Sequence, residues 1–156
     1  MVLAAKKSGA DAVKFQTFRA KDLVTPQTQK VNYQKNTTSL NETHYQMIKS
    51  LELSKKMHYS VFNFCKKNKI EFISTPYGIE AAKFLDKMGC SVFKTASADI
   101  VDLQMHKFLA IKKKLVVISV GMATLHEIKD CINIYKKYKN NNIILLHCVS
   151  NYPCSL

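Results

Sequence analysis

This 156-residue chain has no long apolar run, and no stretch of it approaches the roughly 18 to 20 consecutive apolar residues of a transmembrane helix. Its first residues, MVLAAKKSGADAV, also lack the apolar core and the small-residue cleavage site of a secretory signal peptide. We therefore expect a cytoplasmic protein with no membrane partner. Because 47% of its residues are apolar, the chain can bury the core of one domain.

Several ligand-binding patterns are also missing. None of the five cysteines pairs in a CxxC motif, so we expect small buried hydrophobes in a reducing compartment rather than zinc ligands. No strand pattern is followed by GxGxxG or by GxxxxGK[ST], which argues against a dinucleotide site and a P-loop.

Acidic residues are scarce, with 11 Asp and Glu against 24 Lys and Arg, and the formal net charge is +13. The lysine clusters lie in separate helical patterns or at their ends: Lys6–Lys7, Lys55–Lys56, Lys66–Lys67, Lys112–Lys114 and Lys136–Lys137. No RNP, zinc-finger or basic-zipper pattern accompanies them. We therefore expect a solvated basic surface and no nucleic-acid partner. A non-catalytic protein with a basic anion-binding surface remains the alternative.

Short apolar runs alternate with longer helical patterns along the whole chain. We predict strands over Asp11–Phe18, Glu71–Thr75, Ser91–Ala96, Leu115–Val120 and Ile143–Val149. We predict helices over Glu42–Lys49, Ser54–Lys67, Ile79–Lys87, Leu103–Ile111 and Leu125–Tyr138, with Ser54 and Thr124 as N-caps. The alternation predicts an α/β fold with parallel strands, either an open doubly wound sheet or part of a (β/α)8 barrel. The long interruption from Arg19 to Asn41 follows the first strand, where functional loops occur.

Polar side chains recur near the carboxyl ends of the predicted strands. Lys14 and Gln16 have the same parity and therefore share one face of the first strand. Lys94 lies in the third strand, and hydroxyl residues end two other strands. Ammonium groups in such positions need compensating anions, and few carboxylates are near them in the sequence. The pattern therefore predicts an enzyme site for a small substrate with a phosphate and a carboxylate.

The histidines give weaker signals. His44, His58, His106 and His126 lie in helical patterns, and we expect them at the surface. His147 lies in an apolar strand pattern beside Cys148, and adjacent strand residues face opposite ways, which excludes a Cys–His dyad.

Six segments in order resemble the sialic acid synthase family, the N-acetylneuraminate synthases, over essentially the whole chain. They are GADAVKFQTF, YQKNTT with HYQMIKSLELS, EFISTPY, VFKTASADI, VVISVGMATLHEI and ILLHCVSNYP. The resemblance implies a (β/α)8 TIM barrel, of which residues 1–156 would cover about strands 2 to 6. By this resemblance the chain is a partial catalytic barrel without the family's C-terminal antifreeze-like domain, and it would be inactive alone.

The same resemblance implies condensation of phosphoenolpyruvate with open-chain N-acetylmannosamine, giving N-acetylneuraminate and phosphate. Legionaminic acid synthases share these motifs and are the alternative. The implied phosphoenolpyruvate ligands are Lys14, Thr75, Lys94, Ser97, Ser119 and Ser150, and the implied sugar-facing residues are Gln16, Asp99 and Tyr152. Of these, Lys14, Lys94 and Asp99 are the expected catalytic residues. The resemblance also implies a divalent metal, Mn²⁺ or Mg²⁺, with ligands beyond Leu156, and homodimers of the full-length proteins.

Two positions depart from the family pattern. This chain has ASAD, ending at Asp99, where the family commonly has ASGE, so the carboxylate is one methylene shorter. It also has SVGM, beginning at Ser119, where STGM is more usual.

Overall fold

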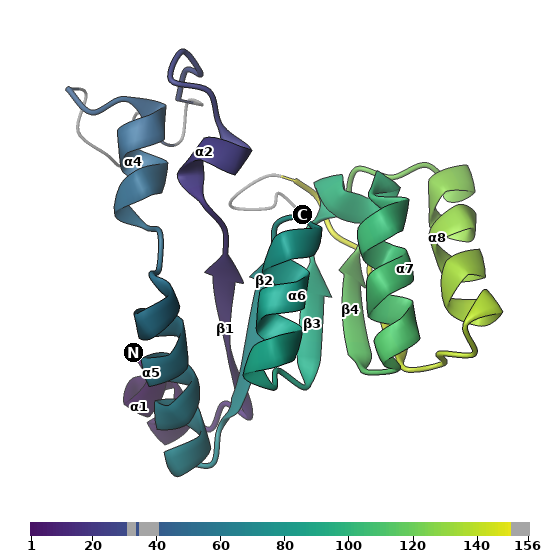
Figure 1. Cartoon of the computed structure of the whole chain (residues 1–156), viewed down its shortest axis with the longest axis horizontal. Coiled ribbons are helices and arrows are strands. Elements are labelled where there is room, and N and C mark those ends of the chain that lie inside the picture. Colours follow the sequence, from purple (N-terminus) through teal and green to yellow (C-terminus); the bar gives the residue numbers. More distant parts are fainter. Residues whose placement is uncertain (31–33, 35–40, 151–156) are drawn as a thin grey trace.

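The computed structural model describes residues 1–30, 34 and 41–150 (Figure 1). They form a parallel five-stranded sheet whose strand order, β1-β2-β3-β4-β5, is the order of the chain. The strands are β1 (Ala12–Thr17), β2 (Glu71–Pro76), β3 (Val92–Thr95), β4 (Leu115–Ser119) and β5 (Ile143–Leu146). The predicted α/β class and all five predicted strands are confirmed. The last strand is shorter than predicted and ends before His147.

Helices connect the strands. They are α1 (Val2–Lys7), α2 (Ala20–Leu23), α4 (His44–Ser50), α5 (Lys55–Lys67), α6 (Ile79–Met88), α7 (Leu103–Lys112) and α8 (Leu125–Lys137), with the 3₁₀ helix η1 (Ser97–Val101) after β3. The five predicted helices are confirmed, and the described residues add three short helices that the sequence did not predict, α1, α2 and η1. The predicted N-caps are confirmed, since Ser54 accepts from the Met57 N–H and Thr124 from the Glu127 N–H. Thr124 and Glu127 form a reciprocal capping box. No helix in the described ranges is long and apolar enough to cross a membrane.

The two faces of the sheet have different surroundings. When parallel strands follow one another in chain order, right-handed crossovers put every connecting helix on the same side of the sheet. In Figure 1, α6 and α7 stand in front of the strands. On this covered face Phe72, Phe93, Val116 and Ile118 are at most 3% exposed and form the core. The alternate residues, among them Lys14, point to a face that the described helices leave open.

The covered face also buries polar groups. The Thr17 hydroxyl lies 2.9 Å from His58 Nε2 and 2.8 Å from the Ser74 hydroxyl. His106 is fully buried, with Nδ1 2.9 Å from the Tyr135 hydroxyl. The prediction of surface histidines is therefore wrong for His58 and His106. Both histidines face the core, His58 from the amphipathic helix α5 and His106 from α7, and a hydroxyl partner offsets part of the cost of burial.

The sheet has free edges at β1 and β5 within the described ranges. Consecutive strands of a (β/α)8 barrel have the same order and the same placement of helices on one side. Closure into a barrel, and the numbering of these strands within it, stay predictions from the family resemblance.

Candidate functional site

The site begins with a lysine on the open face of the sheet. Lys94 lies in β3, and the register with β4 places it opposite Val117, two residues before Ser119. Its Nζ atom donates a 2.6 Å hydrogen bond to the Ser119 hydroxyl and a 3.3 Å bond to the Thr95 carbonyl. Lys94 is half-buried, and Ser119 is only 4% exposed. The ammonium group is therefore held in place at the carboxyl ends of two adjacent strands.

The surroundings of Lys94 disfavour its charged form, chiefly because the side chain is half-buried. Burial lowers the pKa of Lys94 below its usual 10.5, and the neighbouring Lys14 charge lowers it further. Asp99 acts in the opposite direction without cancelling the shift. An anion bound beside Lys94 would offset both the burial and the repulsion from Lys14 that disfavour the charged form of Lys94. The geometry thus supports an anion site.

The same open face continues across β2 and β1, where it carries Thr75, Gln16 and Lys14. The register pairs Lys14 with Ile73 and Gln16 with Thr75, so all three predicted ligands share the face that carries Lys94. Lys14 and Gln16 are exposed, whereas Thr75 is 2% exposed. Gln16 Nε2 donates to the Tyr77 hydroxyl at 3.0 Å. The structure therefore brings these residues to one face, as the parity of the sequence predicts.

Asp99 lies in η1, directly after β3, and its carboxylate has a structural partner. The Ala96 N–H donates to Asp99 Oδ2 at 3.1 Å, which fixes the first turn of η1. Burial raises the pKa of Asp99, although this hydrogen bond acts against the rise. The contact that is observed for Asp99 is thus a backbone contact, and its predicted role towards a sugar stays a prediction.

A close approach of two loops forms the wall of the site beside Ser97. The Gly121 N–H donates to the Ser97 hydroxyl at 3.2 Å, and Cys148 Sγ lies 3.5 Å from the same hydroxyl. A Cβ atom at position 121 would lie 2.3 Å from the Cys148 carbonyl oxygen. Only glycine fits there, which explains the glycine of the SVGM segment.

Sequence reasoning missed the position of Cys148 in this wall. Its hydrogen bond with Ser97 lowers the pKa of the Cys148 thiol. The only signal in the sequence was position, because Cys148 follows β5 as Ser97 follows β3, and its contact with Ser97 depends on the fold. Ser150 is exposed beyond β5, and Tyr152 lies outside the described residues.

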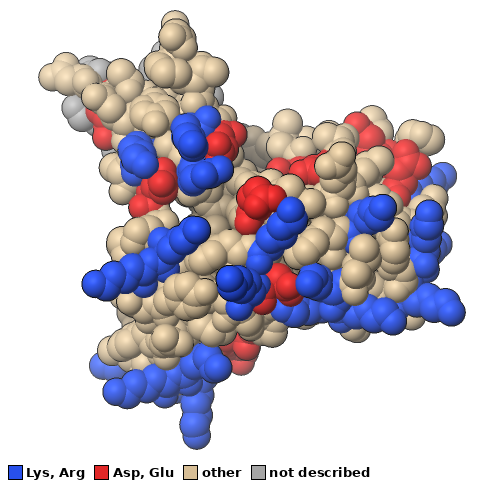
Figure 2. Space-filling model, in the orientation of Figure 1, with Lys and Arg blue, Asp and Glu red and all other residues tan. Residues whose placement is uncertain are grey.

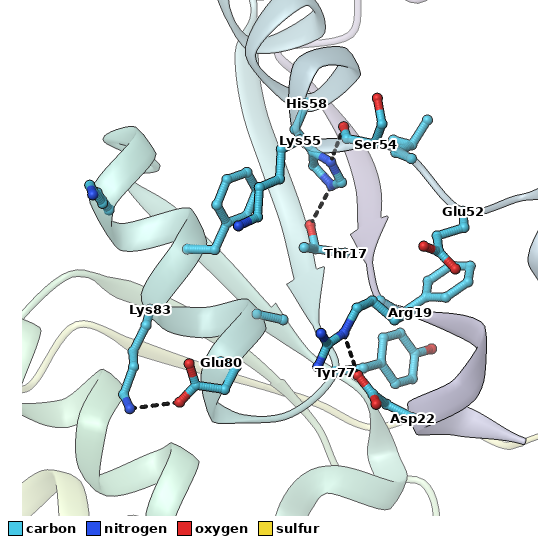
Figure 3. Close-up of a pocket in the computed structure, with 15 residues that line it drawn as sticks. Thr17, Arg19, Asp22, Glu52, Ser54, Lys55, His58, Tyr77, Glu80 and Lys83 are labelled. Carbon is cyan, nitrogen blue, oxygen red and sulfur yellow. Dashed lines mark hydrogen bonds and ion pairs between the residues drawn. The ribbon is translucent and has the colours of Figure 1, made fainter.

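A separate cavity of about 470 Å³ lies behind the end of β1, between α5 and α6. Figure 3 shows Thr17 and His58 in its wall together with two ion pairs, Arg19 with Asp22 and Lys83 with Glu80, each at 2.7 Å. Tyr77 also lines it, so the Gln16–Tyr77 hydrogen bond joins this cavity to the open face. None of the predicted site residues lines the cavity.

The described residues do not form a metal site. Within residues 1–30, 34 and 41–150, no group of three or more His, Cys, Asp or Glu side chains could hold a metal ion. The family resemblance places the ligands of the implied metal beyond Leu156, so that expectation stays a prediction, and we assign none of the described residues a metal-binding role.

Comparison with known proteins gives concordant matches. The model of the NeuB family matches residues 1–156. An N,N'-diacetyllegionaminic acid synthase from Legionella pneumophila is 42% identical over 99% of this chain and 45% of its own length. Another from Campylobacter jejuni is 40% identical over 96% of this chain and 45% of its own length.

A solved structure agrees with these matches. The N-acetylneuraminic acid (sialic acid) synthetase from Leptospira borgpetersenii, crystallised with citrate, superposes with a TM-score of 0.82 at 28% identity. The match covers 99% of this chain and 49% of that protein. The chain thus spans about half the length of the relatives that it matches.

Proposed function

The chain belongs to the NeuB family, and from this we propose that it forms the phosphoenolpyruvate-binding part of a sialic acid synthase. The reaction condenses phosphoenolpyruvate with open-chain N-acetylmannosamine and yields N-acetylneuraminate and phosphate. The single observation that carries the proposal is the Lys94 ammonium group, held by Ser119 on the same sheet face as Lys14.

The charges of the substrate match those of the site. Phosphoenolpyruvate carries a carboxylate and a phosphate, and Lys14 and Lys94 supply one positive charge each. The hydroxyls of Thr75, Ser97 and Ser119 are hydrogen-bond donors for the remaining oxygens. Because Lys94 is half-buried, its attraction for an anion is less screened by solvent than that of a surface lysine.

In the proposed reaction, the methylene carbon of phosphoenolpyruvate attacks the aldehyde carbon of the sugar and forms the new C–C bond. Water adds to the neighbouring carbon, and phosphate departs with cleavage of its C–O bond. Lys14 and Lys94 neutralise the charge on the carboxylate and the departing phosphate throughout. Gln16 and Asp99 lie at the edge where the sugar would enter, and Tyr77 fixes the orientation of the Gln16 amide.

A second candidate differs only in the sugar. The relatives at 42% and 40% identity are named as legionaminic acid synthases, which favours a diacetamido sugar as the alternative acceptor. Both candidates use the same phosphoenolpyruvate site. Assay of the complete enzyme with each sugar would separate them by the ratio of kcat/KM values. Homodimer assembly of the complete protein stays a prediction from the family.

Isothermal titration with phosphoenolpyruvate tests the site directly. We expect Lys94→Ala to weaken binding by at least about tenfold, because a charge-assisted hydrogen bond contributes about 1.5 to 3 kcal/mol. Lys56→Ala removes an exposed lysine of α5 and is the matched control, which should bind as the wild type does. Equal binding by the wild type and Lys94→Ala would reject the site. Salt-sensitive binding to DNA without binding to phosphoenolpyruvate would instead support a non-catalytic basic protein.

A further inference from the structure

The fold gathers lysines that are scattered in the sequence at one end of the molecule. Twelve of the 24 basic residues follow or end the helices that lead into the five strands: Lys6, Lys7, Lys66, Lys67, Lys69, Lys87, Lys112, Lys113, Lys114, Lys136, Lys137 and Lys139. We call this set the basic end. Each helix runs back towards the start of the next parallel strand, so all helix carboxyl ends meet at the same edge of the sheet. The sequence predicts a solvated basic surface, and the fold adds that these lysines lie at one end of the molecule.

Negative charge does not balance the basic end. Only three of the eleven acidic residues, Asp11, Glu71 and Asp86, lie near the starts of the strands. Asp86 pairs with both Lys112 and Lys114, at 2.7 and 2.8 Å. Figure 2 shows Lys and Arg along the lower edge with few Asp and Glu, whereas higher up on the same face Lys, Arg, Asp and Glu lie side by side. The charge is thus segregated along the direction of the strands.

Three of these lysines adopt a backbone conformation that disfavours lysine. Lys69, Lys113 and Lys139 have φ angles of 52°, 53° and 52° after α5, α7 and α8. After α6, the corresponding left-handed position is Gly89. Lysine in the last helical turn would suffice to balance the helix macrodipole. Lysine at the left-handed position adds a conformational cost that the helix dipole does not require.

We propose that the basic end binds the surface of an anionic lipid bilayer. Its cations are all lysines, which suit diffuse attraction to acidic head groups, whereas the single arginine of the chain, Arg19, lies elsewhere. Exposed apolar side chains accompany them in the last helical turns, Phe64 at 42% and Ile111 at 50% exposure. A nucleic-acid strand would favour a groove with stacking rings, and of the twelve lysines of the basic end only Lys87 lines either of the two cavities found in the described residues, namely the larger one.

This orientation is compatible with the proposed function. The anion site lies at the carboxyl ends of the strands, and the basic end lies at their amino ends. A molecule bound through the basic end therefore has its substrate site directed away from the bilayer. Small polar substrates reach the site from the solvent without crossing the interface.

Vesicle co-sedimentation with the 156-residue chain tests the inference. We expect binding to vesicles of phosphatidylglycerol and phosphatidylcholine, no binding to pure phosphatidylcholine, and loss of binding as salt rises. The triple variant Lys69→Gly, Lys113→Gly, Lys139→Gly should lower the partition coefficient about 100-fold, from about fivefold per lysine. The same variant should melt a few degrees higher, because glycine removes the left-handed strain. Weaker binding with higher stability cannot arise from misfolding.

Two further triple variants separate position from net charge. Changing Lys69, Lys113 and Lys139 to Gln should weaken binding as much as the glycine variant does, without raising the melting temperature. Changing the exposed Lys21, Lys56 and Lys83 to Gln removes the same charge elsewhere and should leave binding within a few-fold of the wild type. Unchanged binding by the glycine variant, or an equal loss in this control, overturns the proposal. Binding to single-stranded DNA but not to vesicles also overturns it, and makes nucleic acid the partner.

Discussion

The two faces of the sheet are built from alternate residues of the same strands, yet they have opposite properties. Phe93 is fully buried under the helices, and the next residue, Lys94, is half-buried on the open face. Ile118 and Ser119 alternate in the same way on β4. On the covered face the hydroxyls bond to each other, as Thr17 does to Ser74, whereas on the open face Ser119 bonds to an ammonium group. Along each strand, residues that stabilise the core therefore alternate with residues that face the candidate ligand site.

The largest expected effect is on stability, and it distinguishes two adjacent residues of β3 that lie on opposite faces of the sheet. Phe93→Ala should lower the free energy of unfolding by about 3 to 5 kcal/mol, because it leaves a cavity in the core. Lys94→Ala should change that free energy by less than about 1 kcal/mol while weakening the binding of phosphoenolpyruvate. Urea unfolding and isothermal titration measure the two quantities. Equal destabilisation by both substitutions would contradict the division between faces.

A backbone contact beside Ser97 gives the next largest effect. Gly121→Ala should destabilise the protein by about 2 kcal/mol or more and also weaken phosphoenolpyruvate binding, because the new Cβ would force the Cys148 backbone away. Gly78→Ala is the matched control. Its φ of +83° and ψ of 167° lie in a region that essentially only glycine adopts, but nothing lies within 4 Å of the added Cβ, so it carries only a conformational cost of about 1 to 3 kcal/mol and no loss of ligand affinity. Retained ligand affinity in Gly121→Ala would show that this wall does not shape the site.

The pH dependence of phosphoenolpyruvate binding reports the protonation of Lys94 on the open face. The pKa of Lys94 is lowered below 10.5, so Lys94 loses its proton at a lower pH than an ordinary lysine does. Phosphoenolpyruvate affinity should therefore fall as the pH rises through that lowered value, by up to about tenfold per pH unit. In Lys94→Arg the guanidinium keeps its charge and the fall should disappear. A wild-type affinity that stays constant up to pH 10.5 would contradict this assignment.

The smallest expected effect is a gain in stability, and it comes from a residue on the covered face. The Thr95 hydroxyl is buried and has no hydrogen-bond partner among the described residues. Thr95→Val should leave stability unchanged or raise it by up to about 1 kcal/mol, since it removes an unsatisfied polar group. Ser74→Ala, which deprives Thr17 of a partner, should instead cost about 1 kcal/mol. Thermal unfolding of both variants checks the pair, and a loss of stability in Thr95→Val would reveal an unseen partner.

The sequence predicted the elements and the parity of the open face well, because both depend on local patterns. Alternation placed Lys14 and Gln16 on one face, and the register confirms that they share it with Lys94. The sequence could not show that Lys14 is exposed while Thr75 is buried, because exposure depends on how neighbouring strands and loops pack. Cys148 escaped notice for the same reason, since its contact with Ser97 joins residues 51 positions apart.

Histidines and lysines were harder to predict, for a topological reason. His58 and His106 lie in helices with many polar residues, and the sequence does not reveal the hydroxyl partners that Thr17 and Tyr135 provide across the core. The gathering of lysines depends on every helix ending at the same edge of the sheet, which follows from strand order and not from any local pattern.

The agreement between strand order and chain order also has a consequence for synthesis on the ribosome. From β2 to β5, each strand pairs with the strand made immediately before it. Its pairing partner has therefore already been made when the strand emerges. No early segment has to wait for a distant partner to pair. The sheet of the described residues can therefore grow one unit at a time, at the pace of translation, with new strands added at the edge opposite β1.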